Sequence, residues 1–314
     1  MAAPAPARRP LSIVDLGSLL YLGAVWGAAF LFLRVAAPEV GPVWAAEIRL
    51  VIGTGILLVI AGRSTWRLAR GRLVTFLIVG ALFSAVPFTL ISFATLTLHA
   101  GFTSLLNAAT PLFTAAIAVA FMGQRISWRV AAGLAVGVLA VIVLVGWSPL
   151  EPGLTTILAV AAGLGAPLSY AVAGNLVRAR MADVPPTELA TGMLTGGALV
   201  ALPVAILSGA PGVPQVDGIV SLVGVGVLST ALAWPVFFRV LRRTTPTAAS
   251  TVTFIVPAFA LTWSAILLAE PVGVGLLIGF GLILVSLVLV LGIGIGSSAG
   301  VPWLRRAFGT SSAS

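Results

Sequence analysis

Residues 272–295 read VGVGLLIGFGLILVSLVLVLGIGI and contain no charged side chain. A transmembrane helix needs about 20 consecutive apolar residues, so this stretch is long enough to cross a bilayer. Similar runs fill the chain before it, and a strand at the same depth would leave its backbone unsatisfied in lipid. The sequence predicts ten transmembrane helices, at 12–34, 42–61, 73–97, 102–122, 130–147, 154–177, 187–207, 218–239, 247–268 and 272–295.

Composition supports a membrane protein. Of the 314 residues, 60% are hydrophobic and 8% are charged, whereas soluble domains carry about 25% charged residues. A soluble globular enzyme and a disordered chain are both excluded. Cysteine is absent and His99 is the single histidine, so we expect no cysteine-bound metal, no multi-histidine metal site and no cofactor.

The arginines predict how the helices are oriented. With the N-terminus in the cytoplasm, all arginines except Arg34 and Arg49 fall in cytoplasmic segments, which the positive-inside rule favours. The net charge of +9 is therefore explained by arginines that orient the helices in the membrane. We expect no nucleic-acid partner. We expect a multi-pass protein of a bacterial inner membrane with both termini cytoplasmic.

An internal repeat divides the chain. At a spacing of 146 residues, 103–146 matches 249–292 without a gap, pairing Ser104 with Ser250, Pro111 with Pro257 and Gly133 with Gly279. Five helices per copy make the second copy enter the membrane from the opposite side, which is the inverted-repeat arrangement of many transporters. We expect an all-α fold of two inverted five-helix repeats around a central cavity. The expected units are 1–148 with a disordered tail at 1–10, 149–296, and a cytoplasmic tail at 297–314.

Several motifs resemble a known family, the EamA-type transporters of the drug/metabolite transporter superfamily. They are AGFTS at 100–104, PLFT at 111–114, MGQRIS at 122–127, AAS at 248–250, AEP at 269–271, WG at 26–27 and AEIRL at 46–50. The sequence departs at Gln124, where the family usually has an acidic residue. The resemblance implies a ten-helix exporter of small metabolites, often amino acids or drugs, although some members import.

Polar and aromatic residues within the predicted spans are candidates for lining the cavity, because lipid offers polar groups no partner. Helical spacing aligns Ser104, Asn107 and Pro111 on one face. Serine and threonine hydroxyls also bond to carbonyls of their own helix, and that alternative stays open. The predicted substrate-binding residues are Trp26, Phe30, Ser84, Phe88, Ser92, Asn107, Pro111, Tyr170, Asn175, Trp234, Thr253 and Pro257.

Three ionisable residues are candidates for ion coupling. Glu47 and Arg49 lie in the second predicted span and, two positions apart, point to different faces of the helix. Arg49 either snorkels to the interface, pairs with another helix or binds an anionic group, and Glu47 is a candidate proton carrier. His99 titrates in a range that suits proton coupling or is simply solvated at the membrane interface.

The sequence lacks the motifs of a nucleotide-binding site and of an enzyme active site. No phosphate loop is present, because the glycine-rich run at 292–296 has no following Lys-Ser/Thr, and no catalytic constellation is visible. We expect a secondary active transporter that exports small metabolites by alternating access, with protons as a candidate coupling ion. The alternatives are an importer of a vitamin or similar compound on the same fold, and a non-transporting scaffold or lipid-handling protein.

Overall fold

Helices make up the described part of the chain, and their bounds follow the predicted spans closely. The structure, a computed structural model, describes residues 12–61, 64–122, 127–147, 151, 153–243 and 251–291. The helices are α1 Ile13–Val40, α2 Pro42–Ala61, α3 Ser64–Gly80, η1 Ala81–Ala85, α4 Val86–Thr97, α5 Ala100–Asn107, α6 Thr110–Met122, α7 Trp128–Gly146, α8 Leu154–Arg180, α9 Pro186–Leu207, α10 Val216–Gly226, η2 Val227–Leu232, α11 Ala233–Arg243, α13 Val252–Leu267 and α14 Val274–Leu291.

Local signals explain where helices begin and end. The Ser12 hydroxyl accepts a hydrogen bond from the Asp15 backbone N–H, and the Asp15 carboxylate accepts one from the Ser12 N–H, which makes a capping box at the start of α1. Gly41, at φ 86°, turns the chain between α1 and α2, a conformation that glycine adopts without a steric penalty.

Nine segments in the described ranges are long and apolar enough to cross a membrane, and α13 is a shorter apolar helix. Large apolar side chains are exposed on their outer surfaces, such as Val138 at 62% and Ile142 at 61% on α7, which fits contact with lipid. The prediction of a polytopic all-α membrane protein is confirmed. The predicted tails at 1–10 and 297–314, and the repeat partner Ser250, lie outside the described residues.

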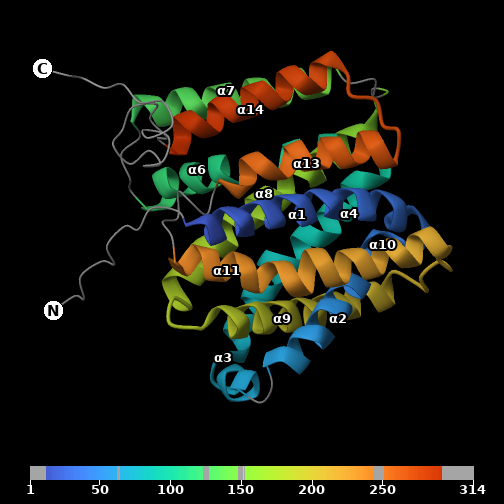
Figure 1. The fold of residues 1–314 in the computed structure, drawn as a ribbon, viewed down its shortest axis with the longest axis vertical. Coiled ribbons are helices and arrows are strands. Elements are labelled where there is room, and N and C mark those ends of the chain that lie inside the picture. Colours follow the sequence, from blue (N-terminus) through green and yellow to red (C-terminus); the bar gives the residue numbers. More distant parts are fainter. Residues whose placement is uncertain are drawn as a thin grey trace, which may run out of the picture.

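The helices run roughly side by side in Figure 1. α1 packs along α13 and α10, α2 and α3 pack on α9, and α8 packs on α4. α7 and α14 pack on each other and form an outer layer beside α6 and α13 (Figure 1). Helices from the two halves of the chain are thus interleaved, and α1 lies centrally, in contact with α4, α10, α11 and α13.

Three predicted spans are less regular than expected. The span at 102–122 is broken, since α5 ends at Asn107 and α6 begins at Thr110. Pro111 therefore lies in the first turn of α6, where its missing N–H costs no hydrogen bond. The prediction of one continuous helix over 102–122 is wrong at this point. Pro257 does lie inside α13.

The other two irregular spans contain π-helical segments. η1 ends two residues before Pro87 and η2 ends three residues before Pro235. A proline ring clashes with the carbonyl one turn earlier, and a widened turn relieves that clash. Carbonyls within the two π-helical segments accept hydrogen bonds from other helices: the Ser169 hydroxyl donates to the Leu82 oxygen at 2.7 Å, and Trp26 Nε1 donates to the Ser229 oxygen at 3.1 Å.

A glycine contact sets the distance between α3 and α9. A Cβ atom added at Gly80 would collide with the backbone of Gly197, and would lie 2.6 Å from the Met193 oxygen. Small residues at such contacts let membrane helices approach closely.

We expect Gly80→Leu to lower the free energy of unfolding in mixed micelles by about 3 kcal/mol, at the upper end of overpacking costs, because the colliding atoms are backbone. Gly55→Leu is the matched control, since no atom lies within 4 Å of its added Cβ. Equal stability of the two variants would show that α3 and α9 can separate freely.

Candidate functional site

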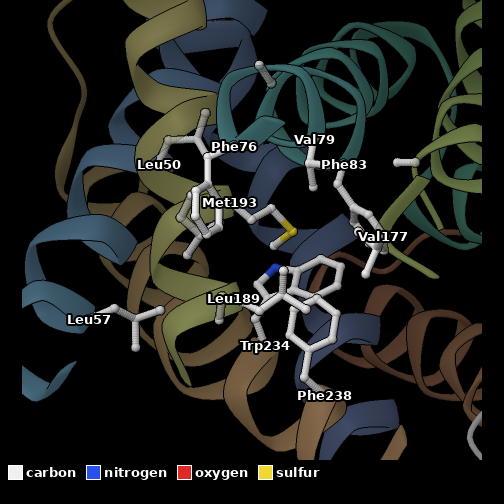
Figure 2. Packing of buried hydrophobic residues seen from close by; sticks show 14 of the residues in the cluster. Leu50, Leu57, Phe76, Val79, Phe83, Val177, Leu189, Met193, Trp234 and Phe238 are labelled. Atoms are coloured by element: carbon white, nitrogen blue, oxygen red, sulfur yellow. The ribbon is translucent and has the colours of Figure 1, made fainter. Parts of the chain in front are cut away.

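An aromatic cluster occupies the interior where α1, η1, α8 and α11 meet. Trp234 of α11 lies 5.1 Å from Trp26 and 5.2 Å from Phe83, measured between ring centroids. Phe237 and Phe238 complete its surroundings, and Tyr170 contacts Phe83 edge-on at 5.5 Å. Figure 2 shows Trp234 in this packing, with Met193, Phe83 and Phe238 around it. The aromatic cluster is defined here as Trp26, Phe83, Tyr170, Trp234, Phe237 and Phe238.

Arg49 adjoins the aromatic cluster. Its side chain is buried, its Nε donates to the Thr230 hydroxyl at 2.7 Å, and its guanidinium carbon lies 3.6 Å from the ring centroid of Phe88. Phe88 packs in the same apolar core as Phe83 and Trp234 of the aromatic cluster. Arg49 of α2, Phe88 of α4 and Thr230 of η2 therefore meet beside the aromatic cluster.

Several buried polar atoms of the interior have no hydrogen-bond partner among the described residues. They are Glu47 Oε2, Thr54 Oγ1, Ser84 Oγ, Asn107 Oδ1 and Trp234 Nε1. Buried polar groups are normally paired, so an unpaired one calls for water, an ion or a ligand. Four of these five residues are among those predicted from the sequence to bind substrate or couple ions.

Other predicted site residues are satisfied locally or lie elsewhere. Ser92 donates to the Phe88 carbonyl of its own helix, and Asn175 donates to the Ala171 carbonyl and accepts from Arg178. Phe30 packs in the apolar core around α1. Thr253 and Pro257 lie on α13, which packs on α1 and α5. Of these residues, Phe30 adjoins the aromatic cluster, because Trp26, Tyr170 and Phe237 pack against the same apolar core.

His99 lies in a different place, an open cleft of about 400 Å³ lined also by Arg34, Val35, Pro38, Leu268 and Glu270. Here Arg34 Nε lies 3.3 Å from Glu270 Oε1. Arg34 also donates to the carbonyls of Thr95 and Leu96 at the end of α4, while Glu270 Oε2 accepts from the Ala100 N–H at the start of α5. The ion pair therefore caps two helix ends at once.

A second ion pair lies at the other end of the bundle. Arg72, near the start of the span at Gly71–Thr97, contacts Asp183 in the loop between α8 and α9, with Nη2 to Oδ2 at 2.6 Å. The hydrogen bond from Arg72 lowers the pKa of the Asp183 carboxyl below its usual range. Each of the two ion pairs joins a helix of the first half of the chain to a loop of the second half.

We expect Glu270→Gln to lower the free energy of unfolding by about 1–3 kcal/mol, because it weakens a charged hydrogen bond at the α5 start and leaves Arg34 without its carboxylate. Arg34→Gln and the double variant complete a double-mutant cycle measured by unfolding in mixed micelles. A coupling energy near zero would show that the two side chains are merely neighbours.

Sequence reasoning missed Phe83 and Phe238 as site residues. Neither carries a motif, and a phenylalanine in an apolar span is ordinary. The available signal was the repeat: Ser84 and Thr230 are separated by the same 146 residues that relate the two copies, as are the first residues of η1 and η2.

Comparison with known proteins gives consistent results. A sequence model of the EamA-like transporter family matches residues 16–146 and again residues 157–292. An uncharacterized transporter of Archaeoglobus fulgidus is 21% identical over 265 residues, covering 82% of this chain and 91% of that protein. The uncharacterized transporter YoaV of Bacillus subtilis is 22% identical, covering 82% of this chain and 90% of YoaV.

Among solved structures, one crystal structure superposes with a TM-score of 0.62 at 16% identity, covering 95% of this chain and 99% of the other. At that identity the similarity concerns the fold alone.

Proposed function

Because the chain belongs to the EamA-like transporter family, we propose that it is a secondary active transporter of a bacterial inner membrane that exports a small metabolite by alternating access. The observation that carries the proposal is the set of buried polar atoms without partners at Ser84, Asn107 and Trp234. A scaffold that only packs side chains would pair or omit such groups. A chamber that admits water and substrate supplies the missing partners.

Two five-helix repeats of inverted orientation form the chamber in this proposal, at 1–148 and 149–296. The double match of the family model and the equal spacing of η1 and η2 support the division. The ion pairs Arg34–Glu270 and Arg72–Asp183 join the two halves at opposite ends of the bundle. Breaking one pair while the other persists would open the chamber to one side at a time.

The accessibility of single cysteines tests this proposal, and the absence of native cysteine removes background labelling. Ser84→Cys and Asn107→Cys would be treated with a membrane-impermeant thiol reagent in right-side-out and in inside-out vesicles. We expect both to be labelled from either side. Val138→Cys, on the exposed face of α7, is the control that neither side should label, and Val213→Cys, 94% exposed in the α9–α10 connection, should be labelled from one side.

Failure of the reagent to reach Ser84→Cys and Asn107→Cys from any side would contradict a chamber and favour the scaffold. The direction of transport is tested in cells that express the protein. Resistance to a toxic compound would indicate export, and growth on a scarce nutrient would indicate import.

Proton coupling is assigned in this proposal to Glu47 and not to His99. Glu47 is buried in α2 with one carboxylate oxygen unpaired, whereas His99 lies in the open cleft. In vesicles loaded with a transported compound, we expect Glu47→Gln to remove the response to an imposed pH gradient and His99→Asn to retain it. An unchanged response in Glu47→Gln would remove this residue from the coupling mechanism.

A further inference from the structure

Arg49 is a buried cation that has no carboxylate partner among the residues that the structure describes. Its side chain is 4% exposed, and the two ion pairs of the described residues, Arg34–Glu270 and Arg72–Asp183, do not include it. Glu47 is only two positions away along α2, but residues at that spacing point to different faces of a helix. Buried charges in membrane proteins are normally paired and mark substrate or ion pathways.

The contacts that Arg49 makes hold its side chain in position and leave the terminal N–H donors of Nη1 and Nη2, called its fork here, free. The Nε atom donates to Thr230 Oγ1, and Phe88 lies under the guanidinium plane. Thr230 in turn donates to the Val225 carbonyl, so its hydroxyl is fixed from both sides. No hydrogen bond from Nη1 or Nη2 occurs within the described ranges, although a guanidinium has five N–H donors.

The surroundings say what kind of group would use that fork. Two parallel N–H donors match the two oxygens of a carboxylate. Trp234 lies one helical turn beyond Thr230, and its indole N–H also lacks a partner in the described part of the chain. Phe88, which lies under the guanidinium, packs in the same apolar core as Phe83, Tyr170 and Trp234. A cationic fork thus lies beside an aromatic surface that carries one free donor.

We propose that Arg49 binds the carboxylate of a small organic anion whose apolar or aromatic body packs against the aromatic cluster. The inference rests on the proposed function in that this anion is taken to be the transported compound. The anion would occupy the Nη donors of Arg49, and the Trp234 N–H would bind a further acceptor on the ligand.

The test uses three probes that share an indole ring and differ in charge: the anion indole-3-acetate, the neutral indole-3-acetamide and the cation tryptamine. Equilibrium binding to the purified full-length protein in micelles would be measured by calorimetry. We expect indole-3-acetate to bind at least about tenfold more tightly than the neutral amide, a difference that corresponds to about 1.4 kcal/mol, and tryptamine to bind most weakly.

Variants then assign that preference to Arg49. Arg49→Gln should reduce the acetate-to-amide ratio to about one, and Arg49→Lys should retain part of it. Thr230→Val keeps the charge but removes the partner of Nε, so the ratio should fall severalfold without disappearing. Arg129→Gln is the matched control, because it removes an equal charge from an exposed position at the start of α7.

Equal binding of the acetate and the amide by the unaltered protein, a preserved preference in Arg49→Gln, or no binding of any probe would each overturn the inference. Transport of the same probes in reconstituted vesicles separates this failure from that of the proposed function. Transport without preference for the anion leaves the transporter and removes the anion site. Binding of the anion at Arg49 without movement across the membrane leaves the site and removes the transporter.

Discussion

Trp234→Ala is expected to lower the free energy of unfolding by about 3–5 kcal/mol, the usual cost of truncating a buried large aromatic side chain. Trp234 is 5% exposed and contacts four other rings of the aromatic cluster. Its removal deletes apolar contact area and leaves a cavity that the surrounding helices cannot fully close. Transport should be lost as well, since the same rings form the wall of the proposed chamber.

A conservative pair of variants separates packing from binding. Trp234→Phe keeps a ring but removes an N–H for which the described residues supply no partner, so stability should stay within about 1 kcal/mol of the unaltered protein. Trp26→Phe removes an N–H that donates to the Ser229 carbonyl in η2, and leaving that buried acceptor unpaired should cost about 1–3 kcal/mol. The two indoles are neighbours, so the comparison holds the environment nearly constant.

The free energy of unfolding of both variants is measured in mixed micelles, and their affinity for a transported compound is measured by equilibrium binding. We expect Trp234→Phe to weaken binding while sparing stability. If Trp234→Phe were instead the less stable of the two, the indole N–H would have a structural partner and the case for a wet chamber at this point would fall.

The sequence predicted the helices well because their signals are local. α2 occupies Pro42–Ala61, the same bounds as expected, because a glycine turn and a proline at the first helical position mark its start. The break at Ala108 and Ala109 was not predicted, because the apolar character of the sequence does not change at these two residues. The π-helical segments were missed too: proline in a span predicts a distortion but not that the turn widens to receive Ser169 and Trp26 from other helices.

The sequence did not predict which distant residues pair, because its signals are local. Arg34 was an exception to the positive-inside pattern, and its partner Glu270 lies at the far end of the chain, so only the packing of α1 against α13 joins them. The structure gathers Trp26, Tyr170 and Trp234 in one cluster and leaves Asn175 and His99 outside it. That any of these residues binds substrate stays a prediction.

Arg49→Met should raise the stability of the protein while removing its preference for anions. A buried unpaired guanidinium carries a desolvation penalty of several kcal/mol. Its contact with Phe88, worth about 2 kcal/mol when desolvated, and its bond to Thr230 offset only part of that penalty. Methionine has a similar length, fills irregular space well and needs no partner. We expect unfolding in mixed micelles to require about 1–2 kcal/mol more in this variant.

Thr230 tolerates the loss because its hydroxyl still donates to the Val225 carbonyl, so the exchange leaves no unpaired donor in η2. A purely structural arginine would behave in the opposite way: its removal would destabilise the protein and leave the ligand preference unchanged. A stability gain together with the loss of the acetate-to-amide ratio identifies a charge kept for binding at the expense of stability. A destabilised Arg49→Met with intact anion preference would instead make Arg49 a brace between α2 and η2.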